Sequence, residues 1–109
     1  MNIKKWSELG GYQEEFAVAI AWLILWADSQ SIKVRIKDAY RAPGLHGAWG
    51  ERKGYGSAHS SHKVSLAVDL FTPAPIDHVR LHDHWDTLGG SKRIEDDMNH
   101  YSFEWQGYR

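Results

Sequence analysis

Two histidines and two aspartates in the second half of the chain have types and spacing that suit metal-dependent hydrolysis. His62 precedes Asp69 by seven residues, and Asp97 precedes His100 by three. Zinc held without cysteine is typically bound by histidine nitrogens and a carboxylate oxygen, which leaves a fourth position for water. A hydrolase also needs a nearby carboxylate to accept the proton of that water. His62, Asp69 and His100 are therefore candidate zinc ligands, and Asp97 is a candidate general base.

The spacing alone leaves alternatives open. The chain contains seven histidines and eight aspartates, so a His–Asp pair at any one offset is a common chance occurrence. His59 lies close to His62 and is an alternative ligand. A domain without metal, in which His62 and Asp69 only hydrogen-bond at the end of a strand, also fits these residues.

The reach of an extended chain limits how His62 and Asp69 can meet. Seven residues of straight strand cover about 23 Å, whereas ligand atoms lie about 2 Å from a shared zinc ion. The chain must therefore reverse between the two residues. We predict that the letters "HKVS" form a turn that folds His62 back, and that the strand begins near Leu66. Asp69 then faces the site together with Ala67, and the alternating apolar residues face the core: Leu66, Val68 and Leu70.

Hydrophobic patterns predict the elements that must position these residues. Residues 13–27 are apolar on every face, which indicates a long N-terminal helix, approached from Ser7 and surrounded by other elements. A Gly-rich stretch, residues 41–61, reads as a long irregular loop, and such loops are usually functional or disordered. The remaining predicted elements are strands over residues 31–40, 66–71 and 100–105 and a helix over residues 77–88. This order indicates an α+β fold with a small antiparallel or mixed sheet packed against the long helix.

We expect the aromatic and histidine residues of the two predicted helices to have structural roles and not to bind a ligand. Trp22 and Trp26 are four residues apart, so we expect both in the core. His82 and His84 are two apart and fall on different faces of a helix. We therefore expect them on a solvated helix surface and not in a second metal site.

Length and composition exclude several classes of protein. The 109 residues suffice for one domain spanning residues 1–109, and the net charge of −1 gives no sign of a nucleic-acid partner. The chain has no cysteine, which excludes disulfides and thiolate zinc sites. The apolar run over residues 16–27 is shorter than the roughly twenty residues of a membrane span, and no convincing signal-peptide pattern accompanies it. We expect a monomer that is synthesised in the cytoplasm.

The candidate residues resemble the motifs of a known family. The pattern Ser-x-His-x-x-Gly-x-Ala-x-Asp, followed by an acidic residue, two others and a histidine, is typical of the zinc peptidases of bacterial cell walls. These include D-alanyl-D-alanine carboxypeptidases and dipeptidases and phage L-alanyl-D-glutamate endolysins, on the hedgehog/DD-peptidase fold. This chain has "SSHKVSLAVD" and "DMNH", and "AYRAP" is similar to the family's Tyr-Arg-Ser/Thr segment. The matching residues are Arg41, Ser60, His62, Ala67, Asp69, Asp97 and His100.

The resemblance implies a role for each matching polar residue. The implied zinc ligands and general base are His62, Asp69, His100 and Asp97. Arg41 and Ser60 would bind or polarise a peptide of the peptidoglycan stem, because arginine can hold a carboxylate or carbonyl with several donors in fixed geometry. The expected protein is a zinc endopeptidase of the phage-endolysin kind, acting on the cell wall after release from the host cytoplasm, or a carboxypeptidase. The alternative is a catalytically inactive domain of the same fold that holds zinc without turnover or serves as an interaction domain.

Two positions depart from the family pattern. Ser65 stands where the family usually has glycine, and if that position requires positive φ the serine costs about 1 kcal/mol or more. Asn99 precedes the last histidine, where some members have tryptophan, which argues against close kinship with the dipeptidase branch. Neither departure replaces a candidate ligand.

Overall fold

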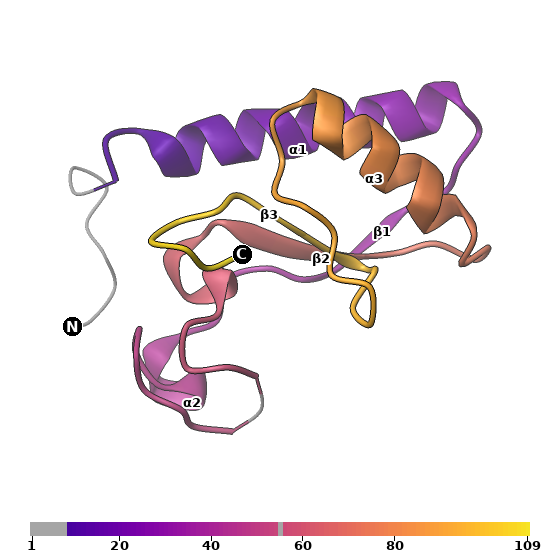
Figure 1. The fold of residues 1–109 in the computed structure, drawn as a ribbon. Helices are drawn as coiled ribbons and strands as arrows, with labels where there is room; N and C mark the ends of the chain where they lie inside the picture. The colour runs from indigo at the N-terminus through magenta and orange to yellow at the C-terminus, as the bar shows by residue number, and fades with distance from the viewer. Residues whose placement is uncertain (1–8, 55) are drawn as a thin grey trace.

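The chain forms a small α+β domain, as the sequence predicts, and its sheet is antiparallel (Figure 1). The computed structural model describes residues 9–54 and 56–109. The three strands lie in the order β1-β2-β3. The elements in chain order are α1 (Tyr12–Ser29), β1 (Arg35–Asp38), α2 (Pro43–His46), the 3-10 helix η2 (Ser61–Val64), β2 (Ala67–Phe71), α3 (Asp77–Thr87) and β3 (His100–Ser102).

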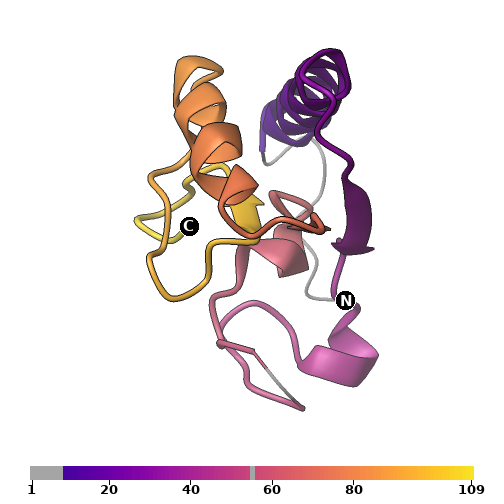
Figure 2. The same cartoon turned by 90° about the vertical axis from the view of Figure 1, so that its right-hand side faces the viewer.

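The two longer helices lie on the same side of the sheet. Figures 1 and 2 show α1 and α3 above the strands, and the loop that carries α2 on the other side. Trp26 of α1 stacks on His84 of α3, with 4.2 Å between the ring centroids. One face of the sheet is therefore covered by helices, and the opposite face is left for the loop and the candidate site.

Alternation along the strands separates the core from the site. Leu66, Val68 and Leu70 are buried and pack in the core with residues of α1 and α3. Tyr101 of β3 pairs with Val68 and is completely buried in the same core. Because neighbouring residues of a strand point to opposite faces, Asp69 must point away from the helices. The predicted division of this strand into a core face and a site face is confirmed.

Helix α1 begins at Tyr12 and is 18 residues long. It contains the predicted helical residues 13–27 but does not start at the N-terminus of the chain. The predicted approach from Ser7 lies outside the described residues, and the residue that precedes the helix is Gly11, with φ of 84° and no side-chain capping bond. Within residues 9–54 and 56–109, no helix has the length and apolar character needed to cross a membrane.

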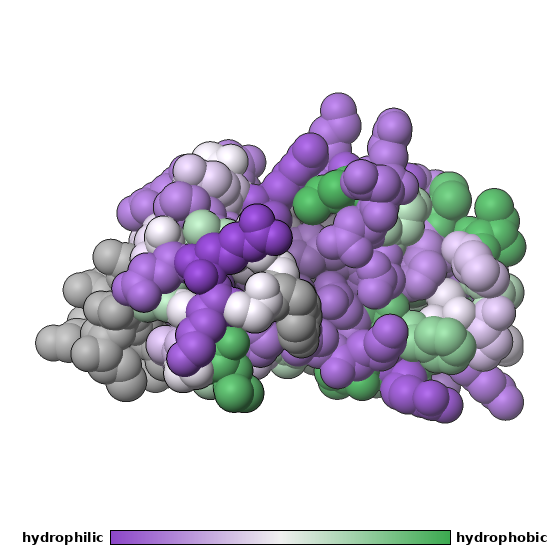
Figure 3. All heavy atoms as spheres, turned by 90° about the horizontal axis from the view of Figure 1, so that it is seen from below, coloured by the Kyte–Doolittle hydropathy of each residue, from purple (hydrophilic) through white to green (hydrophobic). Residues whose placement is uncertain are grey.

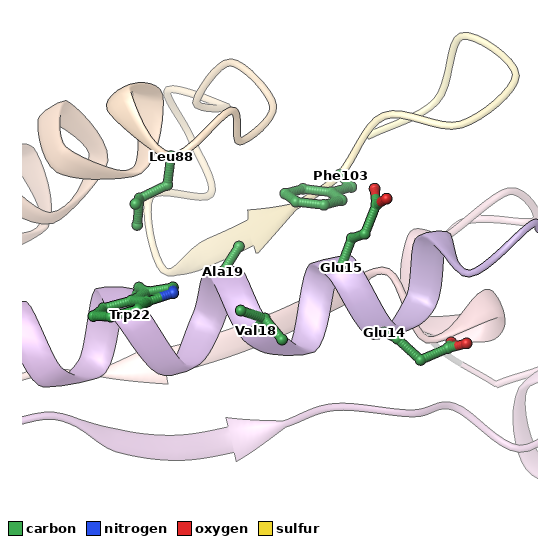
Figure 4. Close-up of a pocket in the computed structure, with 7 residues that line it drawn as sticks. All are labelled: Glu14, Glu15, Val18, Ala19, Trp22, Leu88 and Phe103. Carbon is green, nitrogen blue, oxygen red and sulfur yellow. The ribbon is translucent and has the colours of Figure 1, made fainter.

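The expectation that other elements surround α1 is wrong. Val18, Trp22 and Leu25 are 57%, 59% and 62% exposed, so Trp22 is not a core residue. Trp22 instead lines a shallow groove of about 500 Å³ together with Leu88 and Phe103 (Figure 4). The sheet and α3 bury one stripe of α1, and among the described residues no further layer covers the outer stripe. Although α1 has apolar residues on every face, this small domain buries only one of those faces.

The strand predicted over residues 31–40 is shorter than expected. Strand β1 contains four residues and has an irregular register between Ile36 and Asp38. Ile32 is buried before the strand begins, but Ile36 is 57% exposed, contrary to the prediction of one apolar face. The reason is that β1 is an edge strand, and the two helices do not cover Ile36.

Candidate metal centre

The three predicted ligands meet on the loop-facing side of the sheet. Asp69 of β2 lies directly opposite His100 of β3 in the antiparallel register, and such pairs have Cβ atoms about 4.5–5.5 Å apart. His62 approaches from η2. Its Nε2 lies 3.2 Å from Asp69 Oδ1, and His100 Nδ1 lies 3.3 Å from the same oxygen. One possible ligand atom from each residue falls within 4.8 Å of the other two.

The turn that brings His62 back to Asp69 is the short helix η2. Ser60 caps this turn, because its Oγ accepts a hydrogen bond from the backbone N–H of His62 at 3.3 Å. Ser65 ends the turn in the left-handed region, with φ of 55° and ψ of 38°. The predicted reversal between His62 and Asp69 is therefore confirmed. The position does require positive φ, and a serine in this conformation costs about 1 kcal/mol or more.

The hydrogen bonding of His62 decides which of its nitrogens faces Asp69 with a lone pair. His62 Nδ1 lies 2.6 Å from the backbone oxygen of Ala39, which can only accept, so Nδ1 carries the proton. A neutral imidazole has no second proton. His62 Nε2 then presents a lone pair to the Asp69 carboxylate at 3.2 Å. Two acceptors at this distance require either an additional proton on His62 or a cation between them.

Two of the three donor separations match those expected around a tetrahedral metal ion. Two donors that each lie about 2.0–2.1 Å from zinc at tetrahedral angles are roughly 3.4 Å apart. The separations of Asp69 Oδ1 from His62 and His100 are 3.2 and 3.3 Å. Both histidines are buried, and His100 Nε2 has no hydrogen-bond partner among the described residues. No second bond fixes the tautomer of His100, so its Nδ1 can offer a lone pair to a metal ion.

Asp69 remains a carboxylate in this environment. Burial alone would raise the pKa of Asp69, but when protons lie between the carboxylate and the two histidines, the hydrogen bonds with His100 and His62 outweigh burial and hold that pKa well below its usual range. A cation in place of those protons would favour the carboxylate in the same way. Metal binding requires the deprotonated form of a ligand carboxylate. Asp69 is therefore already in the form that binds a cation throughout the neutral pH range.

Arg41 lies beside the three candidate ligands, and its guanidinium is engaged within the protein. Its Nε donates to Asp38 Oδ2 at 3.1 Å and its Nη1 to Ser60 Oγ at 3.2 Å, while Nη2 lies 4.0 Å from Asp69 Oδ2. The two predicted substrate residues, Arg41 and Ser60, thus contact each other and border the ligand carboxylate. Sequence interpretation missed Asp38, because only the pairing of β1 with β2 brings it opposite Asp69.

A pocket of about 220 Å³ opens next to the histidines. Asp97, in the turn before β3, lines this pocket and is exposed to solvent. Its backbone oxygen accepts a hydrogen bond from the backbone N–H of His100 at 3.0 Å, which ties the candidate base to a candidate ligand. The structure thus brings all six predicted site residues to one place. The other lining residues are Gly56 and Ser57 of the predicted loop, together with Ile94 and Arg109, which the sequence did not indicate.

The long loop beside the pocket is fastened by Lys63. This side chain is only 3% exposed, and its ammonium donates to the backbone oxygens of Ala48, Glu51 and Ala58 at 3.2, 2.5 and 3.2 Å. Because Lys63 follows His62 in η2, the turn that aims the histidine also holds the loop. Seen from below, on the side where the loop lies, the surface is mostly hydrophilic with small separate hydrophobic areas (Figure 3).

A second histidine cluster lies on the helix-facing side of β3. His82 is completely buried, stacks on Tyr101 with 4.1 Å between ring centroids, and donates from Nε2 to the Met98 oxygen at 2.7 Å. His78 Nδ1 lies 2.6 Å from the hydroxyl of Tyr101. The prediction that His82 lies on a solvated surface is wrong, because α3 turns this residue toward β3. Burial lowers the pKa of His82 to about 4, so the ring is neutral at neutral pH.

Comparison of the chain with family models, with curated proteins and with solved structures gave no match. The resemblance to the cell-wall zinc peptidases therefore depends on the motif residues themselves. The geometry adds that these residues, which are far apart in the sequence, are neighbours in space.

Proposed function

We propose that this protein is a zinc-dependent peptidase that cleaves amide bonds in the stem peptides of peptidoglycan, on a hedgehog/DD-peptidase-like fold. The observation that carries the proposal is the convergence of His62 and His100 on one oxygen of Asp69, with Asp97 lining the adjoining pocket. When bound, zinc supplies a Lewis acid for a substrate carbonyl and lowers the pKa of a coordinated water to about 7.

The chain's own residues then have separate tasks. Asp97, at the exposed side of the pocket, accepts the proton of the attacking water and returns it to the leaving amine. Arg41, which Ser60 holds by a hydrogen bond, helps to orient the Asp69 carboxylate. Both residues line the wall along which the peptide binds. The class of substrate comes from the resemblance of "SSHKVSLAVD" and "DMNH" to the cell-wall peptidases. Both an endopeptidase released at phage lysis and a carboxypeptidase agree with these residues.

One observation favours a second candidate, a domain that holds zinc without turnover. The guanidinium of Arg41 is already engaged by Asp38 and Ser60, which leaves fewer of its donors for a substrate. Asp97 distinguishes the two candidates, because a purely zinc-holding domain has no need of a base in the adjoining pocket.

The test is digestion of purified peptidoglycan by the zinc-loaded protein, with mass analysis of the released fragments. We expect wild-type protein to release stem peptides, and Asp97→Ala to bind zinc normally while releasing them about 100-fold or more slowly. Asp96→Ala, at the exposed neighbouring carboxylate, is the matched control and should behave as wild type. Release of the same peptides at the same rate by Asp97→Ala would contradict the assigned base, and no release by wild type would favour the second candidate.

A further inference from the structure

The pocket contains a second arginine, Arg109, to which the proposed mechanism gives no task. We propose that Arg109 binds a carboxylate of the substrate, so that the site prefers peptides with a free carboxylate next to the bond that is cleaved. This inference rests on the proposed function, since it assumes that a peptide occupies the pocket beside His62 and His100.

The C-terminal segment is folded so that Arg109 is held at the pocket. Trp105 and Tyr108 exchange backbone hydrogen bonds of 2.9 and 3.0 Å across a tight turn, in which Gln106 and Gly107 have φ of 51° and 81°. Positive φ at both central residues is the geometry of a two-residue hairpin turn. The turn is therefore a defined structure that ends directly before Arg109.

An aromatic cluster fastens this turn to the loop that borders the site. Tyr108 stacks on His59, with 4.3 Å between ring centroids and 10° between the planes. Trp49 of the loop packs against both Trp105 and Tyr108, at 5.1 and 5.6 Å. His59 immediately precedes Ser60, which lines the pocket. The stacking thus couples the position of Arg109 to the wall of the pocket.

Among the described residues, fewer N–H donors of the Arg109 guanidinium than of the Arg41 guanidinium are engaged by the protein. Its Nη1 donates to the backbone oxygen of Lys92 at 3.2 Å, and this acceptor is neutral. Among the described residues, Arg109 forms no ion pair with a carboxylate, whereas Arg41 pairs with Asp38. A guanidinium presents five N–H donors in a planar fork that matches both oxygens of a carboxylate. The side chain of Arg109 is also exposed, so a ligand can reach it.

The charges around the pocket favour an anionic ligand group at Arg109. Arg41 is paired with Asp38, Asp69 is assigned to the metal ion, and Asp97 must stay available as a base. The charge of Arg109 therefore remains for the substrate. In a stem peptide this carboxylate is either the one at the end of the chain or that of an acidic residue within it.

The test measures binding of three synthetic stem peptides by calorimetry. One has all carboxylates free, one is amidated at its terminus, and one is amidated at its acidic residue. The zinc-loaded 109-residue chain carries Asp97→Ala, which should slow turnover about 100-fold or more, so that binding is measured before the peptide is cleaved. We expect amidation of the recognised carboxylate to weaken binding about tenfold, and the peptide that is weakened identifies which carboxylate is bound.

Substitutions of Arg109 then show whether this residue causes the difference in binding between the free and the amidated peptides. With Arg109→Met the free and amidated peptides should bind equally, and Arg109→Lys should retain part of the difference because it keeps the charge without the fork. Arg80→Met, at an exposed arginine of α3 remote from the pocket, is the control and should leave the difference unchanged. Equal binding of all three peptides, no binding of any, or a difference that survives Arg109→Met would each overturn the assignment. Carboxylate-dependent binding without cleavage by wild type would contradict only the proposed function.

Discussion

Two histidine clusters lie on opposite faces of β3 and differ in the group that joins them. His62 and His100 meet at the carboxylate of Asp69, on the side of the loop. His78 and His82 meet at Tyr101, on the side of the helices. Burial raises the pKa of the Tyr101 hydroxyl, so that group stays protonated.

The difference explains why only one cluster suits a metal ion. Histidine lone pairs that face a carboxylate leave a place for a cation, whereas a phenol can give its proton to the one histidine within hydrogen-bond distance. The cluster around Asp69 also borders a pocket, and the cluster around Tyr101 is packed inside the core. Among the described residues, only the cluster around Asp69 brings three possible metal ligands together. Burial of histidines is therefore common to both clusters, and the shared carboxylate is what separates a binding site from a packed core.

The largest effect is expected when the carboxylate is removed. Asp69→Asn keeps the shape of the side chain but removes the charge, so zinc affinity should fall about 100-fold or more. Competition with a chromophoric chelator measures this change. Tyr101→Phe removes the corresponding group of the other cluster and should leave zinc affinity within about threefold. Equal zinc affinities for wild type and Asp69→Asn would show that the clusters do not differ in the way described.

The core cluster should instead determine how stability depends on pH. The pKa of His82 is about 4 in the folded protein, below the value of about 6.5 in an unfolded chain. The folded state therefore binds fewer protons, so this stabilisation is complete above about pH 6.5 and is lost as the pH falls toward 4. Between about pH 7 and pH 5 the loss should be about 2 kcal/mol in the free energy of unfolding.

Urea unfolding at both pH values, with a chelator present to exclude metal effects, measures this loss. His82→Phe should remove most of it, because phenylalanine cannot take up a proton. His84→Gln, on the same helix, serves as the control and should retain the wild-type pH dependence. If His82→Phe also retains it, His82 is not the group that links pH to stability.

The smallest effect concerns the turn that aims His62. Ser65→Gly should relieve the left-handed backbone and raise the free energy of unfolding by about 0.5–1 kcal/mol, after the greater entropy of glycine in the unfolded chain is subtracted. Zinc affinity should not change, because no ligand moves. Ser31 follows α1 with φ of 58° and lies away from both clusters. Ser31→Gly is therefore the matched control for the effect of replacing a serine of positive φ by glycine. A loss of stability in Ser65→Gly would mean that the serine is not strained there.

Local patterns in the sequence predicted the parts of the fold that local physics determines. The reach of an extended chain required a turn between His62 and Asp69, and η2 provides it. Alternation in β2 placed Asp69, the central residue of that strand, on the site face. Those arguments compare only residues close in sequence, and they succeeded for that reason.

Features that depend on tertiary packing were not predicted. The exposure of Trp22 depends on how many elements cover α1, and the burial of His82 depends on the rotation of α3 against β3. Asp38 and Arg109 reach the site only through strand pairing and the folding of the C-terminal turn. Lys63 gives no sequence signal, because its partners are backbone oxygens of a loop.

The most direct measurement of the central claim is the metal content of the wild-type protein, purified without a histidine tag and dialysed against zinc at neutral pH. We predict about one equivalent of tightly bound zinc per chain, lost on substitution of His62 by alanine. Less than about half an equivalent, or a zinc content that His62→Ala leaves unchanged, would contradict the metal site at His62, Asp69 and His100.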